Sequence, residues 1–441
     1  MWSEAGLPKP DRLIANARYQ RTLSEIYGYS SLHRAAHLVR ADRLKKPARL
    51  RALLSELGNP QANFPCILVA GTKGKGSTAA MIASILGAAG LRTGRYTQPH
   101  LVSWRERTWV NGRYLSVDDT IRLFPHVRDA ADRLEVRRPD LGRLTTFEIG
   151  TAFSLLWFAH AEVAAAVIEV GVGGRQDATN ALEPVVSVIT PVSYDHADVI
   201  GPEISDIAYE KAGIMRPGRP VIIGRQSDDA APVLRAESSR LQAQAEWIGS
   251  NWTWSAIAKA DPVVHAPEFS ILGPEVILAG LQLPVIGDFQ RENATAALAA
   301  VVRSGLVEND RLPQAARAGL SQLRWPGRVH VVRERPLVIF DGAHNAESAR
   351  QLADTLKRSF GPRKRHWVIG MSRGKDVRGF LNEIREAASA VTVTTTSHDR
   401  SLTAQELAEL AKTQFKESSP PITVAEAASP VAALSAALAQ S

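Results

Sequence analysis

A glycine- and lysine-rich stretch between an apolar run and a helical run has the composition of a phosphate-binding loop. It follows the apolar residues 66–70 and reads Gly71-Thr72-Lys73-Gly74-Lys75-Gly76-Ser77-Thr78. Glycines let backbone N–H groups close around phosphate oxygens, and the start of the following helix adds positive potential. In this pattern Lys75 reaches the outer phosphates, and the Ser77 hydroxyl binds a magnesium ion.

The spacing of this loop departs from the standard Walker motif, because Val69 stands where the first glycine belongs and Gly76 follows the lysine. The alternative interpretation is a glycine-rich turn that binds no ligand. We predict that the loop binds ATP together with Mg²⁺. The residues predicted to bind ATP are Thr72, Gly74, Lys75, Gly76, Ser77 and Thr78.

Two further apolar runs contain or precede ionisable residues. Glu169 lies inside the run 163–170, where an unpaired carboxylate would be costly to bury. Magnesium favours carboxylate and phosphate oxygens, so it is one partner for this acid, and a salt bridge to Arg175 is the alternative. His196 follows the run 185–192. A lone histidine there is more often a structural hydrogen-bonding group, but its expected place near Glu169 favours a metal ligand.

Lys211 lies in the sequence AYEKAG at residues 208–213, which predicts a short helix closed by Gly213. An exposed lysine at this position would carry no role. In a crowded, partly desolvated site, however, a lysine has a lowered pKa and becomes nucleophilic. Carbon dioxide can convert such a lysine to a carbamate, a carboxylate-like group able to hold a second metal ion.

Two motifs in the last third of the chain also stand out. Residues 325–328 read WPGR, and residues 341–345 read DGAHN directly after the apolar run 337–340. Arg328 could close over a transferring phosphoryl group, as arginines do elsewhere. The alternative is a turn followed by a helix cap at Asp341.

These residues require an architecture that brings the ends of several strands together. Four apolar runs, at residues 66–70, 163–170, 185–192 and 221–224, alternate with helical sequence. Continuous apolar strands separated by helices indicate a parallel sheet that is covered on both faces. Ligands of such sheets gather beyond the carboxyl ends of the strands, where the first three runs meet the motifs above. We therefore predict an α/β fold that opens with a P-loop parallel-sheet ATPase domain.

The segment 323–328 should be a hinge, because Pro326 and Gly327 would interrupt a helix or strand. Beyond it, strands are expected at 329–333, 337–340, 367–370, 391–396 and 422–425. Helices are expected at 346–360, 378–388, 404–413 and 427–439. The predicted domains are 1–322, with an N-terminal helical segment and an irregular β-rich insertion at 242–281, and 329–441, a smaller Rossmann-like α/β domain.

The composition is that of an ordinary globular protein. The 441 residues include 45% hydrophobic and 22% charged residues, and the chain is longer than one core usually serves. No apolar stretch reaches the about 18 residues of a membrane helix. The single cysteine, Cys66, excludes an intrachain disulfide and a multi-cysteine zinc site. With no secretory signal at the N-terminus, these features predict a cytoplasmic protein without membrane partners, and we expect a monomer.

The net charge of +8 is concentrated at the N-terminus. Residues 1–60 contribute +6, from 11 basic and 5 acidic residues. Such a segment could touch nucleic acid, but it lacks a recognisable binding module and interleaved aromatic residues. A solvated helical face, or the steering of anionic substrates toward a cleft, would explain the charge equally well. Nucleic-acid binding is therefore the less favoured interpretation.

Taken together, the motifs resemble those of the folylpolyglutamate synthase/dihydrofolate synthase family within the Mur-ligase-like superfamily. The resemblance spans roughly residues 20–410, and a GKG followed by serine is specific to this branch. In chain order the matching pieces are LGNP (57–60), GTKGKGS (71–77), YTQPHL (96–101), ER (106–107), EVGVGGRQDATN (169–180), DH (195–196), IAYEKAGI (207–214), NA (293–294), WPGR (325–328) and DGAHN (341–345).

The resemblance implies a role for each matched position. It implies Ser77, Glu169 and His196 as magnesium ligands, with Lys211 as a carbamylated metal-binding lysine. It implies that Asn293, Arg328 and Asp341 contact ATP, with His344 beside them, and that Lys75, Lys211 and His344 are the catalytic residues. The implied folate or pterin contacts are Thr97, Gln98, Pro99, His100, Gly173, Gly174 and Arg175. The implied glutamate contacts are Lys375, Asp376, His398 and Arg400 in the C-terminal domain.

Three positions depart from the pattern of the family. Gln98 replaces the usual serine of TSPH, which the family links to the pterin site and to a metal. Phe289 stands where the family commonly has a histidine, and Gln176 replaces the usual leucine after GGR. The first departure bears most directly on the acceptor and metal sites.

The implied activity is the ATP-dependent addition of L-glutamate to a folate carboxylate, either tetrahydrofolate polyglutamylation or the conversion of dihydropteroate to dihydrofolate. The carboxylate would attack the γ-phosphate, and the glutamate amine would then attack the resulting acyl phosphate. Water must be excluded from both steps, and domain closure at the hinge would provide that. Another Mur-type amino-acid ligase is the nearest alternative, and a non-catalytic protein that binds ATP or nucleic acid is the other.

Overall fold

The computed structural model describes residues 7–29, 42–195, 197–256, 268–396 and 400–440. The predictions made for His196 and His398 therefore lie outside the described residues. The chain forms two compact units. The first consists mainly of Met1–Ala258 and Phe289–Trp325, and the second mainly of Pro326–Ser441.

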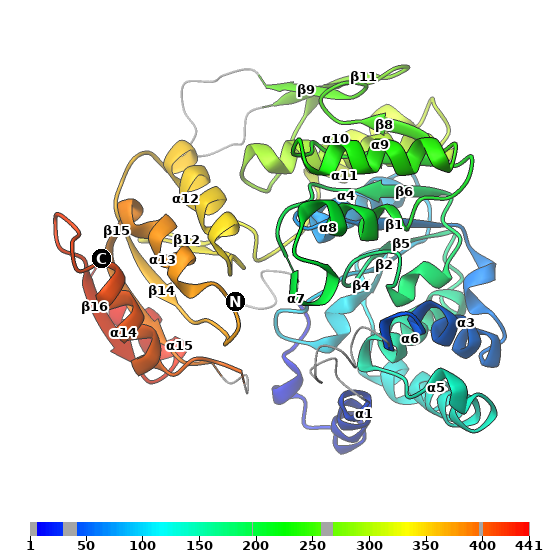
Figure 1. Ribbon diagram of the computed structural model, residues 1–441, viewed down its shortest axis with the longest axis horizontal. Helices are drawn as coiled ribbons and strands as arrows, with labels where there is room; N and C mark the ends of the chain where they lie inside the picture. Colours follow the sequence, from blue (N-terminus) through cyan, green and yellow to red (C-terminus); the bar gives the residue numbers. More distant parts are fainter. Residues whose placement is uncertain (1–6, 30–41, 196, 257–267, 397–399, 441) are drawn as a thin grey trace. The chain divides into compact units, whose positions relative to one another are not determined.

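A sheet with eight strands in the described part of the chain forms the centre of the first unit (Figure 1). Its strands, in chain order, are β1 (Cys66–Ala70), β2 (Thr93–Tyr96), β3 (Thr108–Val110), β4 (Arg113–Tyr114), β5 (Ala165–Glu169), β6 (Val186–Ile189), β7 (Pro220–Ile223) and β8 (Gln244–Trp247). Their spatial order is β4-β3-β2-β5-β1-β6-β7-β8. In this spatial order, all neighbouring strands in the part β2-β5-β1-β6-β7-β8 are parallel. Strands β3 and β4 form antiparallel pairs at the β2 edge of the sheet.

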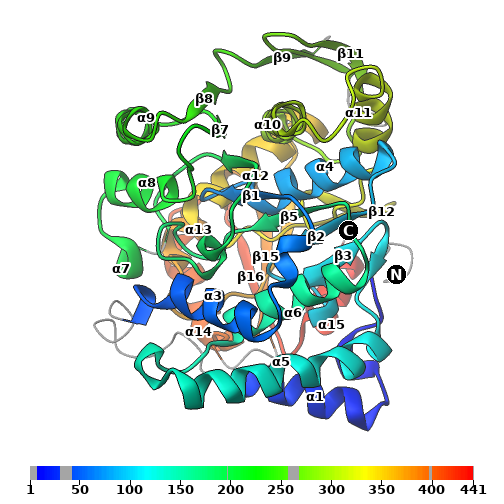
Figure 2. The same ribbon diagram turned by 90° about the vertical axis from the view of Figure 1, so that its right-hand side faces the viewer.

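Helices cover both faces of this sheet, as predicted. They are α1 (Ala17–Gly28), α3 (Lys46–Glu56), α4 (Lys75–Ala88), α5 (Val117–Arg137), α6 (Thr146–His160), α7 (Ala197–Ile200), α8 (Ile204–Ala212), α9 (Ala230–Arg240), α10 (Asp288–Ser304) and α11 (Leu312–Ser321). Figure 2 shows α4 and α10 on one side of the sheet and α5 and α6 on the other. All residues of β1 and β5 are buried for this reason, which explains their continuous apolar sequence.

The register between the two central strands places an acid beside the phosphate loop. In the parallel pair of β1 and β5, Val69 lies opposite Glu169, the last residue of β5. The chain leaves β1 at Ala70 and enters α4 at Lys75. The loop between them and the side chain of Glu169 are therefore at the carboxyl edge of the sheet.

The β-rich character predicted for residues 242–281 is confirmed in its described part. Strand β8 joins the large sheet, and three further strands form an antiparallel sheet of order β11-β10-β9. These strands are β9 (Thr253–Ala256), β10 (Phe269–Leu272) and β11 (Ile277–Leu281).

The second unit has a three-stranded parallel sheet of order β14-β15-β16 in its described part and a separate hairpin of β12 and β13. The strands are β12 (His330–Glu334), β13 (Leu337–Phe340), β14 (Arg365–Ile369), β15 (Ala388–Thr394) and β16 (Thr423–Ala427). The helices are α12 (Ala346–Phe360), α13 (Val377–Ile384), α14 (Ala404–Gln414) and α15 (Pro430–Ala439). The hairpin is antiparallel because only two residues connect its strands, and a parallel pair would need a long crossover.

One predicted helix, 378–388, is shorter in the structure than its sequence suggested. Helix α13 ends at Ile384, and a 3₁₀ turn at Arg385–Ala387 follows it. Ala388 already belongs to β15, where it pairs with Arg365 of β14. Among the described residues, no helix combines the length and the apolar character that a bilayer crossing requires.

Candidate functional site

The loop after β1 is fixed by hydrogen bonds to the segment that follows β6. The Thr72 N–H donates to the Pro191 carbonyl at 2.9 Å, and the Thr72 hydroxyl donates to the Ser193 carbonyl at 3.0 Å. A Cβ atom on Gly71 would lie 1.8 Å from the Thr190 hydroxyl oxygen, so only glycine fits there. These contacts fix the start of the loop against the segment that follows β6.

Gly74 and Asn293, which were both predicted to contact ATP, lie side by side. Gly74 caps α4 with φ +85°, a left-handed conformation that favours glycine. A Cβ atom at this position would lie 2.4 Å from the Asn293 Oδ1 atom. The Asn293 amide, on α10, donates in turn to Gln290 Oε1 at 3.0 Å. Helix α10 thus brings a buried amide to the phosphate loop.

Glu169 lies against the first turn of α4. A Cβ atom on Gly76 would be 3.3 Å from Glu169 Oε2 and 2.9 Å from the Trp325 ring. The Glu169 side chain is buried, and its Oε2 accepts a hydrogen bond of 2.8 Å from the Gln98 N–H. The alternative salt bridge to Arg175 is not the arrangement seen, because Arg175 pairs with Glu237 at 2.6 Å.

The residues at this edge of the sheet fit a magnesium ion. Ser77 and Glu169 are buried hard oxygen donors next to the phosphate loop, and nucleotide phosphates and water would complete the coordination. Gln98 Nε2 and the Thr78 hydroxyl are buried without a hydrogen-bond partner among the described residues. No cluster of three His, Cys, Asp or Glu side chains suited to a metal occurs in the described ranges, which leave out His196.

Lys211 reaches the same loop from α8. Its Nζ atom donates to the Gly71 carbonyl at 2.7 Å, and only 5% of the residue is exposed. Burial lowers the pKa of Lys211 to about 7, assisted by the positive charge of Lys75, while Asp195 and other nearby carboxylates act in the opposite direction. The structure therefore provides the crowded, desolvated setting that the sequence interpretation required.

The turn at Gly173 and Gly174 packs on α8 beside Lys211. A Cβ atom on Gly173, at φ +82°, would lie 2.8 Å from Glu210 Oε2, and one on Gly174 would lie 2.6 Å from the Glu210 carbonyl oxygen. Arg43 forms an ion pair of 3.2 Å with Glu210. Close packing thus explains both glycines. Arg175 itself stacks over the ring of Tyr209, at 3.9 Å from the ring centroid.

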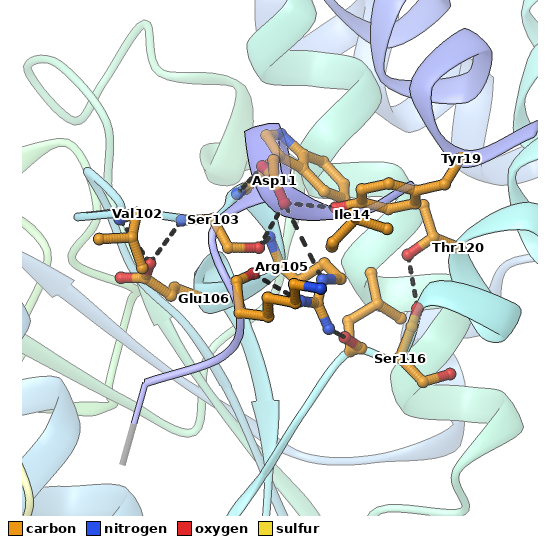
Figure 3. A network of polar contacts seen from close by, with 12 residues as sticks. Asp11, Ile14, Tyr19, Val102, Ser103, Arg105, Glu106, Ser116 and Thr120 are labelled. Carbon is orange, nitrogen blue, oxygen red and sulfur yellow. Dashed lines mark hydrogen bonds and ion pairs between the residues drawn. The ribbon is translucent and has the colours of Figure 1, made fainter. Parts of the chain in front are cut away.

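The loop that contains the predicted pterin-binding residues is organised by a carboxylate. Glu106 accepts hydrogen bonds from the N–H groups of Leu101, Val102 and Ser103, at 2.8, 2.7 and 2.6 Å (Figure 3). His100, next to Pro99, accepts a hydrogen bond of 3.1 Å from Arg107 at its Nδ1 atom. Burial, reinforced by the Arg107 charge, lowers the pKa of His100 to about 4, so this imidazole is neutral near pH 7.

The remaining predicted residues of this loop lie at its start. The Thr97 side chain is buried, and its N–H donates to the Arg107 carbonyl at 2.9 Å. Gln98 follows and contacts Glu169 through its backbone. The structure therefore places the predicted pterin-binding loop directly beside the predicted metal ligand.

Asp11, a residue that the sequence interpretation missed, ties the N-terminal segment to this loop (Figure 3). Its carboxylate accepts hydrogen bonds from the Tyr19 hydroxyl at 2.6 Å, the Ser103 hydroxyl at 2.6 Å and the Trp104 N–H at 2.7 Å. Tyr19, Ser103 and Trp104 are fully buried. Burial and the neighbouring carboxylate raise the pKa of Tyr19, so its hydroxyl remains a donor.

We predict that Asp11→Ala lowers the free energy of unfolding by about 1–3 kcal/mol, because it leaves buried donors unpaired. Chemical denaturation followed by circular dichroism measures this change. Asp129→Ala is the matched control, because the Asp129 side chain is 55% exposed and, within the described ranges, forms an ion pair with the adjacent Arg128 alone. Equal stability of the two variants would contradict the anchoring role of Asp11.

In the second unit, the structure brings Arg328, Asp341 and His344 together. Asp341 accepts hydrogen bonds of 2.8 Å from the N–H groups of Val329 and Ala343. Arg328 Nη1 lies 2.6 Å from the point where a Cβ atom of Gly342 would stand, and His344 Nδ1 is 2.8 Å from the Gly342 carbonyl oxygen. Asp341 does not cap the following helix.

The N-cap of α12 is Asn345, whose side chain accepts a hydrogen bond of 3.0 Å from the Ser348 N–H. The helix-cap explanation that the sequence left open for Asp341 is therefore wrong. Its carboxylate instead braces the loop after β13 against the start of β12.

Two of the predicted glutamate-binding residues, Lys375 and Asp376, line a pocket of about 450 Å³ at the start of α13. Asp376 caps this helix, accepting a hydrogen bond of 2.9 Å from the Gly379 N–H. The backbone of Arg400 accepts from the Arg373 N–H at 2.7 Å. The pocket lining is Arg373, Gly374, Lys375, Asp376, Val377, Arg378, Leu402 and Leu410.

Two family models match the chain along most of its length. The Mur ligase middle domain matches residues 69–301, and the Mur ligase, glutamate ligase domain matches residues 327–441. Curated relatives include the dihydrofolate synthase/folylpolyglutamate synthase of Bacillus subtilis, 34% identical over 78% of this chain and 79% of the relative. The Mycobacterium tuberculosis protein of the same description is 35% identical over 83% of this chain and 77% of its own length.

Solved structures show the same similarity over almost the whole chain. The folylpolyglutamate synthase of Mycobacterium tuberculosis complexed with ADP and AMPPCP superposes with a TM-score of 0.85 at 32% identity, covering 96% of this chain and 91% of that one. FolC of Escherichia coli in complex with DHPP and ADP gives a TM-score of 0.77 at 29% identity, covering 98% of this chain and 99% of that one.

Proposed function

The chain belongs to the folylpolyglutamate synthase/dihydrofolate synthase family of Mur ligases, and from this premise we propose how its residues carry out the family's reaction. It is an ATP-dependent ligase that adds glutamate to a folate-type carboxylate. The observation that carries the mechanistic proposal is the meeting of Asn293, Glu169 and Lys211 at one phosphate loop.

We propose that the loop from Thr72 to Thr78 holds the triphosphate of ATP. Gly74 and Gly76 would present backbone N–H groups to the phosphates, and Lys75 at the start of α4 would neutralise charge that develops on the transferring phosphoryl group. Lys75 Nζ now donates to the Thr72 carbonyl at 3.3 Å, so its ammonium group is already beside the loop. Asn293 would fix the nucleotide from α10.

Ser77 and Glu169, with His196, would hold a magnesium ion, which would supply positive charge to neutralise the phosphates of ATP. Lys211 would serve as a carbamate that binds a second cation. In the second unit, we propose that Arg328 and Asp341 contact ATP and that His344 assists the reaction. The support for these roles is the match to the family's motifs and the local clustering described above.

The reaction proceeds in two displacements. The acceptor carboxylate oxygen attacks the γ-phosphorus atom, the bond to the bridging oxygen breaks, and ADP leaves. The glutamate amine then attacks the carbonyl carbon of the acyl phosphate, loses a proton and displaces inorganic phosphate. Neutral His100 and the loop from Thr97 would present the acceptor next to Glu169, and the pocket near Lys375, with Arg400, would receive glutamate.

The assay that tests the function measures ADP release with glutamate and each acceptor in turn. Tetrahydrofolate, dihydropteroate and a uridine-nucleotide cell-wall precursor form the panel. We expect turnover with at least one pterin acceptor and none with the cell-wall precursor. Turnover with the precursor alone would favour another Mur-type amino-acid ligase.

We predict that the pterin-dependent release of ADP requires Mg²⁺. Chelation with EDTA should reduce turnover to background, because the phosphate charge at Ser77 and Glu169 is then not neutralised. Adding Mg²⁺ in excess of the chelator should restore it. Full activity after exhaustive chelation would reject the proposed metal site.

A further inference from the structure

Arg95 is a buried cation clamped between two tryptophan rings beside the phosphate loop. It lies on β2 and is only 4% exposed. Its guanidinium carbon is 4.8 Å from the ring centroid of Trp109 and 4.8 Å from that of Trp325. Trp109 is its cross-strand neighbour on β3, whereas Trp325 comes from the end of the first unit. Such cation–π contacts are strongest where water is excluded.

Burying a charged guanidinium group costs desolvation free energy, which contacts inside the protein must offset. Arg95 Nε has no hydrogen-bond partner among the described residues. Burial lowers the pKa of Arg95, while Tyr114 and the carboxylate of Glu169 raise it. Arginine nevertheless stays protonated in proteins, so Arg95 keeps its positive charge in this buried position. The two tryptophan rings therefore stabilise the buried guanidinium group of Arg95.

Trp325 contacts both Arg95 and the phosphate loop. Its Cζ2 atom lies 2.9 Å from the point where a Cβ atom of Gly76 would stand, and Glu169 Oε2 lies 3.3 Å from the same point. The Trp325 Nε1 atom is buried and without a hydrogen-bond partner in the described part of the chain. The indole edge and the carboxylate thus flank the first turn of α4 together.

We propose that Arg95 is a positioning residue of the ligase site: by holding Trp325 against Gly76, it fixes the first turn of α4 and the Glu169 carboxylate in the geometry that binds nucleotide. The proposal rests on the proposed function of the phosphate loop. Arg95 acts through Trp325 and Glu169 and does not itself touch the nucleotide. Without the cation, the indole loses one of its stacking faces, and the loop residues it supports become less ordered.

The test measures binding of Mg²⁺–ADP by calorimetry in variants of the full chain. Arg95→Met keeps the length of the side chain but removes the charge, and we expect binding about tenfold weaker, or about 1.4 kcal/mol. The KM for ATP should rise by a similar factor, whereas the KM for the pterin acceptor should not change. Arg92→Met, at an exposed arginine before the same strand, should bind as the wild type does.

A double-mutant cycle tests whether Arg95 acts through Trp325. Trp325→Leu should weaken binding to the same extent as Arg95→Met, and the double variant should bind no more weakly than either one. Additive losses, about a hundredfold in total, would overturn the proposal. Arg95→Lys keeps a cation between the rings and should recover part of the affinity. It also replaces Arg95→Met in the cycle if that variant does not fold.

The outcomes separate this proposal from the proposed function. If the wild-type protein does not bind Mg²⁺–ADP, the nucleotide site itself is wrong. If the wild type binds and folded Arg95→Met binds equally well, the clamp has no positioning role and only this inference fails.

Discussion

Lys75→Ala is expected to lower kcat by about 10²–10³-fold while leaving the fold intact, because it removes a positive charge aimed at the transferring phosphoryl group. Lys75 is the first residue of α4, and its side chain is partly exposed; among the described residues it makes one weak hydrogen bond, of 3.3 Å, to the Thr72 carbonyl. Little of the stability of the fold depends on it. Steady-state assays of ADP release measure the effect, and circular dichroism checks the fold.

Lys75→Arg is the matched variant, because it keeps the charge but changes its shape and reach. We expect this variant to retain an intermediate activity. Turnover close to that of the wild type in a correctly folded Lys75→Ala protein would show that the loop between β1 and α4 does not carry the reaction.

Lys211→Ala is expected to lose most of its activity and to regain part of it with added short-chain carboxylic acids. The proposed carbamate would supply two oxygen ligands to a cation, whereas an ammonium group would repel one. Its removal leaves a space next to the Gly71 carbonyl that a small carboxylate can fill. Undiminished turnover of Lys211→Ala would refute the proposal, and so would a bare amine at Lys211 in a crystal structure with magnesium and nucleotide.

The carbamate also predicts a dependence on pH and carbon dioxide. The amine nitrogen bonds to the carbon of CO2 and releases a proton, so only the neutral amine reacts. The pKa of Lys211 is lowered to about 7, so the neutral form predominates above that pH and disappears below it. We expect enzyme stripped of CO2 at low pH to recover at higher pH more rapidly with bicarbonate than without. Equal recovery would contradict a carbamate.

The sequence predicted the central strands well, because burial on both faces leaves a simple pattern. Strands β1, β5 and β6 appear in the sequence as apolar runs. Strand β2 reads TGRY and was not identified, although every residue in it is buried. Its arginine is accommodated by two tryptophans, of which Trp325 is far away in the chain. The periodicity of hydrophobic residues within one segment cannot reveal a contact between residues so far apart in the sequence.

The candidate site was predictable where it followed strand ends and motifs. Ser77, Glu169 and Lys211 were identified because each is an unusual residue beside an apolar run or glycine. Asp11 was not, because it lies in a short 3₁₀ helix at Asp11–Leu13 and its partners are separated from it by up to 93 positions. The positioning roles that we propose for Asp11 and Arg95 depend on tertiary contacts that composition and spacing do not encode.

The most direct test of the central claim follows the oxygen atoms of the acceptor carboxylate. The enzyme is incubated with ATP, Mg²⁺, L-glutamate and a pterin acceptor whose carboxylate carries heavy oxygen, and the products are analysed by mass spectrometry. The account predicts two results. The acceptor gains a glutamyl residue, and each inorganic phosphate released carries one heavy oxygen atom. A glutamylated product with no label in the phosphate, or ATP hydrolysis without glutamylation, would contradict it.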